Sequence, residues 1–519
     1  MLYKKILPIL IILLFLLTSG CISIFPFISF SINSYEIVDD SGFPAIKINF
    51  STSSQVILEL YDNNNDILSS DVIFYSGDRT SKLDIGEYNE IPTGRYTLKV
   101  YDLAHIYEIY EKTFSFKFKN LLLFSDQQKW WEDKKGWVLG IIVFQVFNKG
   151  KTIIYPSTVK LVVNDSIYYG KVLPTFILPF KQGEINCIFY QYIPRGSYAN
   201  LTILDIDNNI IGMENVYLNP SEILPTETFN WRYRHILHNI YLPSADILYN
   251  YYTNLDRIYY EDYSVYIFNS YDDTYIDLLS QKLLEYSPKD DVDRINFIAS
   301  FVQHLEYRED PDNGSIEYPF YPLETLYTNG GGGDCEDKAI LTASLLKNLG
   351  YNVSLLRFPN HMAVGVNIVG NIDRYIDDYC FLETTTGNYK VGEVPLSYKS
   401  KENVTVYPVL DKPILLHIWK DQSITIYRSS PYGDFIKAEV IVENLGLKPA
   451  RKIDVLAGFF QNSSPFKTSI KSISLLKPGM KERIVFILEI PEDVETVFKT
   501  QILMDDKVSE EREAVDTFP

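Results

Sequence analysis

The chain is poor in cysteine and in positive charge. It holds 4 cysteines in 519 residues, and its 48 lysines and arginines face 67 aspartates and glutamates, which gives a formal net charge of -19. Because the negative charge is spread through the chain, it repels a polyanion, and we expect no nucleic-acid partner. The cysteines and histidines also lack the paired close spacings of zinc sites. We therefore predict neither a metal ion nor another cofactor.

The first apolar run of the chain is short for a membrane span. This run, Ile6–Leu17, follows two lysines and leads into Thr18-Ser19-Gly20-Cys21. A charged zone, an apolar zone and a small-residue zone in this order are typical of a secretory signal. Cys21 resembles the lipid-anchor residue of a lipoprotein processing site, whereas Thr18 stands where an aliphatic residue is usual, so an uncleaved anchor is the alternative. We expect an exported protein held by the membrane at its N-terminus, on the outer face of the cytoplasmic membrane.

The small number of cysteines also bears on their pairing. Lipidation of Cys21 would leave three, and an odd number outside the cell leaves at least one thiol free or paired between chains. Cys187 and Cys380 each lie in a short apolar pattern that is typical of a small buried residue. Cys335 follows a glycine run and has two interpretations, a disulfide with Cys380 or a reactive thiol. A disulfide rarely needs the helix start that follows Cys335, so we favour the thiol.

What the chain has in abundance is short alternating apolar patterns separated by turn residues, which are typical of β-sandwiches. Three segments show them: 30–116, 117–220 and 412–508. Between the second and third lie a tyrosine-rich, partly helical connector over 221–286 and a unit over 287–400 in which helices precede strands. That order predicts an α+β domain. The last residues, 509–519, are acidic, and we expect them to form a tail.

The second and third sandwich segments share a short repeat. Val146-Phe147-Asn148-Lys149-Gly150 corresponds to Val442-Glu443-Asn444-Leu445-Gly446, and each is followed by a further apolar strand. The repeat predicts related immunoglobulin-like modules, which commonly act as spacers or docking surfaces and whose fold alone names no ligand. The tyrosines of the connector have two interpretations, a carbohydrate-stacking surface or interdomain packing. We favour packing, because no group of polar residues suited to a ligand accompanies them.

The most informative stretch is Asn329-Gly330-Gly331-Gly332-Gly333-Asp334-Cys335-Glu336-Asp337. Apolar residues then recur at helical spacing until Gly350, so Cys335 should lie in the first turn of an amphipathic helix. Asp334 is the expected N-cap, and Asp337 its capping-box partner. The free N–H groups and the positive dipole end of such a helix favour a thiolate, and they could later hold the oxyanion of an acyl intermediate.

Two later strands carry a base and an acid. His361 starts an apolar strand on the same face as Ala363 and Gly365, and small neighbours on that face leave room for the helix that carries Cys335. A further strand ends near Glu383, which comes within reach of His361 if the two strands pair. A nucleophile, a base and an orienting carboxylate then follow one another in the order Cys, His, acid.

Several ordered motifs carry a family resemblance. They are Gly333-Asp334-Cys335-Glu336-Asp337-Lys338-Ala339, Leu349-Gly350-Tyr351, His361-Met362-Ala363-Val364-Gly365-Val366 and Leu382-Glu383-Thr384-Thr385, with Tyr321-Pro322-Leu323-Glu324-Thr325-Leu326 and Val391-Gly392-Glu393-Val394-Pro395 beside them. Together they resemble the transglutaminase-like family of papain-type folds. The resemblance implies a papain-like α+β core, here flanked by immunoglobulin-like sandwiches. It also implies that Cys335 is the nucleophile, His361 the general base and then acid, and Glu383 the group that orients the imidazole.

Two positions depart from the family pattern. Glu383 stands where aspartate is more common, and a glutamate can accept the same imidazole N–H through a longer arm. Met362-Ala363 follows the histidine where an aromatic residue is often found, which bears on the choice of substrate. Nearby acidic residues have simpler interpretations: Glu306 and the segment 310–312 as solvated surface, and Glu324 and Glu336 as groups that cap loops.

The sequence thus predicts an extracytoplasmic cysteine enzyme that performs acyl transfer or hydrolysis on amide or peptide substrates. Its expected partner is a protein or peptide substrate, with the cell envelope as one source. The alternative is a non-catalytic cell-surface binding or scaffolding protein that works through its sandwich modules. A zinc site made of Cys335, His361 and Cys380 is a weaker rival, because close ligand spacings are missing.

Overall fold

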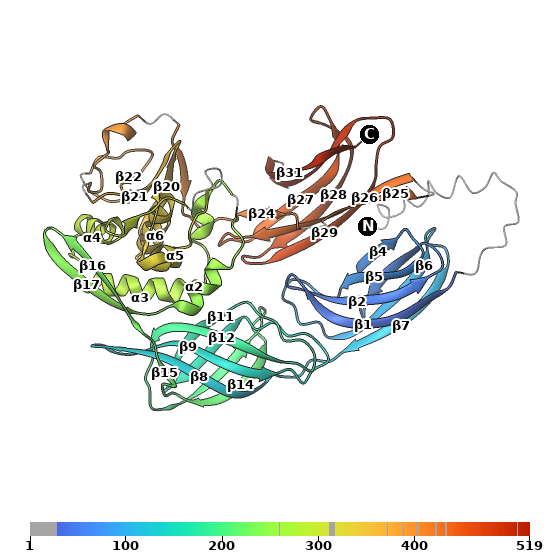
Figure 1. The fold of residues 1–519 in the computed structure, drawn as a ribbon, viewed down its shortest axis with the longest axis horizontal. Coiled ribbons are helices and arrows are strands. Elements are labelled where there is room, and N and C mark those ends of the chain that lie inside the picture. The colour runs from blue at the N-terminus through green and yellow to red at the C-terminus, as the bar shows by residue number, and fades with distance from the viewer. Residues whose placement is uncertain are drawn as a thin grey trace, which may run out of the picture.

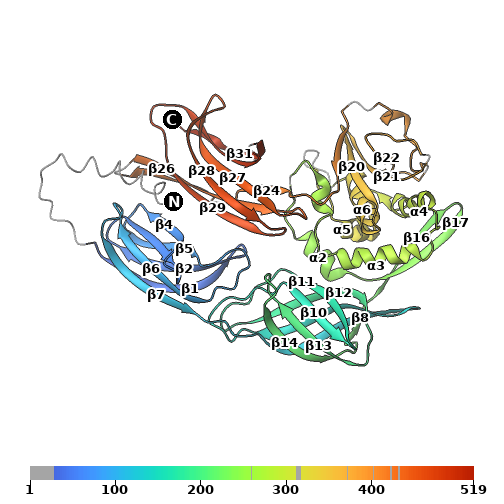
Figure 2. The same cartoon turned by 180° about the vertical axis from the view of Figure 1, so that it is seen from behind.

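The computed structural model describes residues 28–258, 260–310, 317–370, 372–387, 389–400, 403–420, 423–430, 433–505 and 507–518. The predicted signal segment, with Cys21, lies outside these ranges. The described residues form four bodies, three made of strands and one of helices and strands, as Figures 1 and 2 show. Over these ranges, every helix is too short or too polar to cross a membrane. The chain is mostly β-sheet, divided among several sheets, as predicted.

The N-terminal sandwich (residues 30–116) consists of two antiparallel sheets. Its strands are β1 (Phe30–Asp40), β2 (Phe43–Thr52), β3 (Val56–Tyr61), β4 (Ile67–Ile73), β5 (Gly77–Asp84), β6 (Gly94–Asp102) and β7 (Glu108–Phe116). One sheet has the order β1-β2-β5, and the other has the order β4-β3-β6-β7. Alternate side chains, such as Ile48 and Phe50 of β2 and Leu58 and Leu60 of β3, are fully buried in one core. Period-two alternation therefore places the apolar side chains between the sheets.

The eight-stranded body (residues 122–223) is one continuous sheet, where the sequence predicts a sandwich of two. Its strands are β8 (Leu122–Asp133), β9 (Gly136–Phe147), β10 (Thr158–Val163), β11 (Ser166–Val172), β12 (Gln182–Tyr192), β13 (Tyr198–Leu204), β14 (Ile210–Tyr217) and β15 (Glu222–Ile223). The sheet order is β14-β13-β10-β11-β12-β9-β8-β15. A short pairing, Lys171 with Ile188 and Val172 with Cys187, joins what would otherwise be two layers. The sheet encloses a core that includes Ile185, Cys187 and Phe189, the face predicted for β12.

The C-terminal sandwich (residues 415–518) contains the predicted tail as its last strand. Its strands are β24 (Leu415–Ile418), β25 (Ile424–Ser430), β26 (Gly433–Asn444), β27 (Ala450–Gln461), β28 (Ser464–Leu476), β29 (Lys481–Glu489), β30 (Thr496–Met504) and β31 (Lys507–Phe518). The prediction of an acidic tail over 509–519 is therefore wrong for the described residues. Glu511 and Glu513 of β31 pair with Lys499 of β30 at 2.9 and 2.6 Å, and Phe518 is buried in the core. Acidic side chains here lie on the outer face of a sheet-edge strand.

The repeat seen in the sequence corresponds to the same hydrogen-bond network in two bodies. Asn148 is fully buried, its amide nitrogen donates to the carbonyls of Thr152 and Ile177, and its amide oxygen accepts from the N–H of Gly150. In the C-terminal sandwich, buried Asn444 makes the equivalent bonds to the carbonyls of Lys448 and Leu476 and to the N–H of Gly446. Each asparagine ties the turn after its strand to a neighbouring segment.

The α/β body (residues 226–408) carries the helices. They are α2 (Asp246–Thr253), η1 (Tyr263–Tyr266), α3 (Asp273–Leu284), α4 (Asp291–Gln303), α5 (Pro322–Tyr327), η2 (Thr328–Gly330), α6 (Cys335–Asn348) and η3 (Leu396–Tyr398). Its strands are β16 (Thr226–Tyr233), β17 (Ile236–Pro243), β18 (Glu306–Tyr307), β19 (Gly332–Gly333), β20 (Asn352–Phe358), β21 (His361–Asn367), β22 (Cys380–Leu382) and β23 (Thr405–Pro408). The main antiparallel sheet has the order β22-β21-β20-β23. Helix α6 lies beside it, as Figure 1 shows.

From residue 226 on, the tyrosine-rich segment 221–286 belongs to this body and is more than a connector. Trp231 of β16 packs edge-on against Phe297 of α4, and Tyr252, Tyr266 and Tyr275 are buried in the same core as α6. That core also reaches side chains of β9 and β12 in the eight-stranded body. The tyrosines thus pack between elements, the simpler of the two interpretations of their abundance.

The first and last bodies of the chain meet. Arg483 of β29 pairs with Asp40 and Asp84 of the N-terminal sandwich at 2.9 and 3.0 Å, and Lys437 of β26 pairs with Asp71 at 2.6 Å. Both views of the ribbon show these two sandwiches side by side, with the eight-stranded and α/β bodies completing a closed arrangement.

Candidate active site

The glycine run before Cys335 is anchored by backbone pairing. Gly332 and Gly333 form the short strand β19, which pairs in parallel with Glu306 and Tyr307 of β18. Gly332 has a φ of +153°, and a Cβ added there would lie 2.5 Å from the carbonyl oxygen of Glu306. A Cβ on Gly333 would overlap the carboxylate of Asp337. The backbone of Glu306 therefore requires a glycine at position 332 and the side chain of Asp337 favours one at 333, whereas the sequence alone indicates only flexibility.

Helix α6 begins where the sequence predicts. Asp334 is its N-cap, and the capping box closes with Asp337, whose Oδ2 accepts the backbone N–H of Asp334 at 3.2 Å. The other oxygen of Asp337 accepts the N–H of Phe320 at 2.7 Å, which ties the helix start to the segment before α5. The helix ends at Asn348, and Gly350 follows with a φ of +87°. Cys335 is thus the first residue of a helix fixed at both ends.

His361 and Glu383 meet through the pairing of β21 with β22. The strands are antiparallel, with Val364 opposite Leu382 and Gly365 opposite Phe381. Continuing this register past the strand end makes Glu383 the diagonal neighbour of His361 on one face. The imidazole Nε2 lies 3.1 Å from Oε2 of Glu383, and both side chains are almost completely buried.

The carboxylate of Glu383 is fully satisfied. Its second oxygen, Oε1, accepts the N–H of Thr384 and the N–H and hydroxyl of Thr385 at 2.7–2.9 Å. Burial opposes ionisation of this group, but the hydrogen bonds from His361 and Thr385 outweigh it and hold the pKa of Glu383 below its ordinary value. An ionised carboxylate accepts the Nε2–H of His361, which leaves Nδ1 as the basic nitrogen.

An aromatic ring also orients His361. The ring of Tyr398, in η3, stacks on the imidazole with centroids 4.6 Å apart and an angle of 12° between the planes. The sequence lacks an aromatic residue directly after the histidine, and here one comes from a segment 37 positions further on. Nothing in the local pattern around Leu396–Tyr398 indicates this contact, because it depends on how the loop after β22 folds back.

The small-residue face of β21 does not receive α6, contrary to prediction. Met362, Val364 and Val366 share the core of α6, whereas Ala363 packs with Phe381 and Tyr375 in a separate cluster. Small side chains leave room on that face for large aromatic rings, and the bulky aliphatic face meets the helix.

The sulfur of Cys335 lies beside the start of β21. The backbone of Met362, the residue after His361, forms a hydrogen bond to it, and the thiol donates to Oε2 of Glu336 at 3.2 Å. Burial raises the pKa of the Cys335 thiol, the carboxylates of Glu336 and Asp334 raise it further, and the contact with Met362 lowers it. The helix dipole was expected to favour a thiolate, but burial and two adjacent acidic groups dominate this end of α6.

Two buried polar residues, Lys338 and Gln303, bond to the segments that surround the site. Lys338 lies one helical turn after Cys335, and its Nζ donates to the carbonyl of Leu305 at 2.6 Å, beyond the end of α4. Burial lowers the pKa of Lys338 to about 8, although the nearby carboxylate of Glu383 acts to raise it. Gln303 of α4 donates to the backbone carbonyl of Glu383 at 2.8 Å. Lys338 is visible in the sequence as a lysine on the buried face of the helix, whereas Gln303 gives no such signal.

Acidic residues gather on the outer side of Cys335. One oxygen each of Asp310, Glu317, Asp334 and Glu336 lies within 4.8 Å of the others. Burial raises the pKa of Glu336, and the neighbouring Asp334 adds to the rise. Asp310 therefore belongs to a cluster, where the sequence predicts solvated surface for 310–312; residues 311 and 312 lie outside the described ranges.

The other acidic residues near the site behave as predicted or are simply exposed. Glu324 accepts the N–H of Tyr321 at 2.9 Å and forms a buried ion pair with Arg257 at 2.6 Å. Glu306 is exposed and pairs with Arg308. Neither residue reaches the thiol, so both stabilise the segments that lead to it.

Among the described residues, the geometry supports neither rival interpretation of Cys335, a disulfide with Cys380 or a zinc site. Cys187, Cys335 and Cys380 are all free thiols, and Cys187 and Cys380 are buried. The clusters able to hold a metal in this part of the chain do not bring Cys335 together with His361 and Cys380. Cys380 instead packs in the core on the α6 side of the sheet. A disulfide and a zinc site of these residues are therefore not formed.

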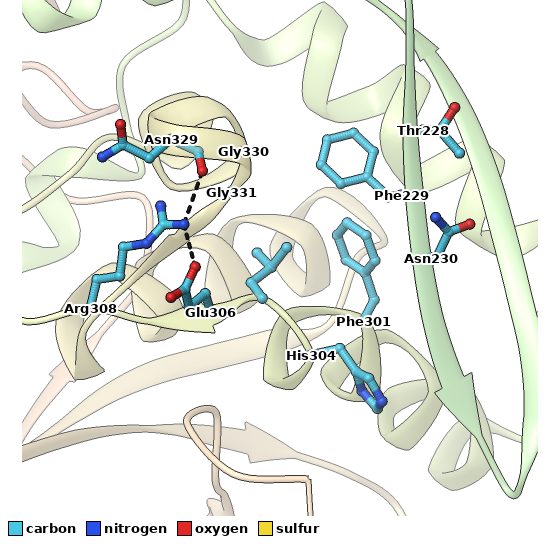
Figure 3. A pocket seen from close by; sticks show the side chains of 11 residues that line it. Thr228, Phe229, Asn230, Phe301, His304, Glu306, Arg308, Asn329, Gly330 and Gly331 are labelled. Atoms are coloured by element: carbon cyan, nitrogen blue, oxygen red, sulfur yellow. Dashed lines mark hydrogen bonds and ion pairs between the residues drawn. The ribbon is translucent and has the colours of Figure 1, made fainter.

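A pocket of about 310 Å³ opens beside the glycine run, and Figure 3 shows it from close by. It is lined by Thr228, Phe229, Asn230, Phe301, His304, Leu305, Glu306, Arg308, Asn329, Gly330 and Gly331. Arg308 donates to the carbonyls of Thr328 and Asn329 at 2.7 and 2.9 Å, which fixes the turn before the glycines. None of the three predicted catalytic residues lines this pocket.

Comparison with known proteins gives little beyond this geometry. No protein-family model matches the sequence, and no curated protein matches it either. A crystal structure of red sea bream transglutaminase aligns at 12% identity over 73% of this chain and 80% of that one, with a TM-score of 0.18. The YadV chaperone aligns at 12% identity over 37% of this chain and 100% of that one, with a TM-score of 0.13. At such TM-scores neither likeness carries an argument about fold or function.

Proposed function

We propose that this chain is an extracytoplasmic, transglutaminase-like cysteine enzyme that uses Cys335, His361 and Glu383 for acyl transfer or hydrolysis. The proposal rests on one observation: the thiol and the His361–Glu383 pair lie together at the same end of the sheet. A thiol at a capped helix start contacts the backbone next to His361, and His361 is held by a carboxylate with a full set of donors. Each part has the role that nucleophilic catalysis requires of it.

The reaction begins with transfer of the Cys335 proton to Nδ1 of His361, because Glu383 occupies Nε2. The thiolate then attacks the carbonyl carbon of a carboxamide or peptide, and the carbon–oxygen double bond opens to an oxyanion. Backbone N–H groups at the start of α6 point toward that charge. The imidazolium returns its proton to the nitrogen, which leaves as an amine or ammonia, and a thioester on Cys335 remains.

Either of two nucleophiles completes the cycle. A primary amine attacks the thioester and yields a new amide, whereas water yields a carboxylic acid, and in both cases His361 takes up the incoming proton and the thiol is restored. The substrate is a protein or peptide, and the cell envelope is one source of it. The same proposal places the protein outside the cytoplasmic membrane with residues 1–21 as its anchor, which the order of charged, apolar and small residues supports.

Removal of the thiol tests the proposal. A glutamine-containing peptide and a fluorescent primary amine are supplied together, and ammonia release and amine incorporation are both measured. We expect Cys335→Ala to abolish both signals and to keep its melting temperature, because the thiol is half-buried and leaves little space behind. Cys380→Ala is the matched control, which removes a buried thiol that takes no part in the reaction.

The possible outcomes separate the proposal from its rival. Activity that survives Cys335→Ala would assign the reaction to another group. A wild-type protein that binds peptides equally well with and without Cys335, and releases no ammonia, would support a cell-surface binding protein that works through its sandwiches. Loss of activity in Cys335→Ala alone supports the thiol mechanism.

A further inference from the structure

We propose that Lys338 is a positioning residue that joins the two halves of the candidate site. Its ammonium group holds the segment that pairs with the glycine run before Cys335. Its positive charge balances the carboxylate of Glu383, which keeps His361 neutral and basic. The inference deepens the proposed function and rests on it, because a base at this place has a task only if the thiol reacts.

Lys338 is buried where a lysine is rarely found. It lies on α6, three residues after Cys335, and its side chain is fully buried. Removing an ammonium group from water is costly, and proteins usually offset the cost with a carboxylate. Here the ammonium group donates to two backbone carbonyl oxygens, that of Leu305 at 2.6 Å and that of Gln303 at 3.5 Å. Carbonyl dipoles do not cancel a full charge, so the charge also acts on its surroundings.

The bond to Leu305 fixes the segment that leads to the nucleophile. Leu305 directly precedes β18, which pairs in parallel with β19 of the glycine run. Strand β19 ends two positions before Cys335. The helix that carries the thiol therefore holds, through Lys338, the strand on which its own start rests.

Gln303 provides the second connection, toward the sheet. Its backbone carbonyl accepts from Lys338, and its side-chain amide donates to the backbone carbonyl of Glu383 at 2.8 Å. Lys338 and Glu383 therefore both bind the last residue of α4. Gln303 is itself buried, and salt screens charges in such a place only weakly. The carboxylate of Glu383 accordingly acts to raise the pKa of Lys338, against the effect of burial.

This charge bears on the form that His361 adopts. Hydrogen bonds satisfy the carboxylate of Glu383 but do not cancel its charge, and a buried carboxylate favours a protonated imidazole beside it. The other titratable groups beside this pair, Cys335 of α6 and Tyr398 of η3, can only add negative charge. The positive charge of Lys338 offsets that preference. His361 then stays neutral, with Nδ1 free to take the thiol proton.

Two substitutions of the lysine separate its charge from its hydrogen bonds. Lys338→Gln removes the charge and keeps an amide that can donate, whereas Lys338→Arg keeps the charge. NMR of isotope-labelled histidine follows the ring signals of His361 against pH, and their loss in His361→Ala assigns them. We expect these signals to titrate at a pH higher by about half a unit or more in Lys338→Gln, and close to wild type in Lys338→Arg. Lys347→Gln, in the last turn of α6, is the matched control and should leave the titration unchanged.

Turnover supplies the second measurement. With a glutamine-containing peptide and a primary amine, kcat/KM at pH 7 should fall by roughly tenfold or more in Lys338→Gln, mainly through kcat. Lys338→Arg should recover part of the loss. Equal losses in both variants, together with an unchanged titration of His361, would mean that Lys338 only supports the fold and would overturn the inference.

Because Lys338 is buried and its variants could fail to fold, the reciprocal substitution keeps the test decisive. In Glu383→Gln the ammonium group loses the carboxylate that attracts it. The pKa of Lys338, followed by NMR of isotope-labelled lysine, should then fall below its wild-type value of about 8. An unchanged pKa would overturn the link between the two groups. Neither titration needs turnover, so an inactive wild type would contradict the proposed function, whereas the titrations would still decide on Lys338.

Discussion

On the sheet side of the candidate site, both oxygens of Glu383 have donors, and an aromatic ring fixes the plane of His361. On the helix side, the thiol of Cys335 lies beside the carboxyl groups of Asp334 and Glu336, which are hydrogen-bonded to each other and raise the pKa of the thiol. The two halves lie at the same end of one sheet and differ in what the protein itself supplies.

This difference separates two tasks of a nucleophilic site. The base needs a fixed orientation before substrate arrives, and hydrogen bonds within the chain provide it. The nucleophile needs surroundings that favour its ionised form, and at the start of α6 burial and two carboxyl groups oppose ionisation of the thiol. The comparison therefore indicates that the sheet half is complete in its hydrogen bonds, whereas the helix half holds its thiol in the neutral form among buried carboxyl groups.

The largest expected effect comes from a substitution of Glu383, on the sheet side of the site. Glu383→Gln keeps the size of the side chain but replaces the accepting carboxylate with an amide, so His361 loses the partner that fixes its basic tautomer. We expect kcat/KM for amine incorporation to fall by roughly 10³–10⁴-fold. Glu393→Gln, in the loop after β22, is the control and should leave the rate unchanged. Full activity in Glu383→Gln would show that Glu383 does not orient the base.

Much of this architecture can be predicted from the sequence, because it rests on local rules. Alternating apolar residues place β2 and β3 in a sandwich, and Asp334, Asp337 and Gly350 mark both ends of α6. The strand pattern brings Glu383 near His361 because only one turn and one pairing separate them. The Asn148 and Asn444 repeat corresponds to two equivalent sets of hydrogen bonds for the same reason.

What could not be predicted depends on contacts between distant segments. Segment 221–286 shares its core with α6, and Tyr398 reaches His361 from beyond β22. The acidic end of the chain forms β31 because Lys499, on a neighbouring strand, neutralises it. Asp310 joins Glu336 only because β18 pairs with the glycine run. None of these contacts leaves a periodic signal in the sequence.

A smaller effect is expected from substitution of Thr385, whose hydroxyl is hydrogen-bonded, than from Glu383→Gln, and the adjacent Thr384 provides a comparison. The hydroxyl of Thr385 donates to Glu383 at 2.7 Å, whereas the buried hydroxyl of Thr384 has no partner. Thr385→Val should lower kcat/KM by roughly tenfold, because it removes one hydrogen bond to a charged group. Thr384→Val removes a hydroxyl that is already unsatisfied, so stability measured by urea unfolding should stay the same or rise. If both variants lost the same amount of activity and stability, the hydrogen bond from Thr385 to Glu383 would have no special role.

The smallest effect concerns the pH dependence of stability. The pKa of Glu383 is lower in the folded protein than its ordinary value of 4.5, so its ionised form stabilises the fold. This contribution is present above pH 4.5 and is lost as the pH falls through the folded pKa. The gap in unfolding free energy between the wild type and Glu383→Gln should therefore shrink as urea titrations move from pH 7 to pH 3. A gap that stays constant over this range would contradict the assigned direction of the shift.

The central claim, a reactive thiol served by His361, is tested most directly by trapping its acyl intermediate. The protein is mixed with p-nitrophenyl acetate, p-nitrophenolate is followed by absorbance, and the quenched protein is mapped by mass spectrometry. The account predicts a rapid burst, an acetyl group on Cys335, and much slower acetylation of Cys335 in His361→Ala. Acetylation of Cys335 at the same rate in wild type and His361→Ala, or an unchanged burst in Cys335→Ala, would contradict it.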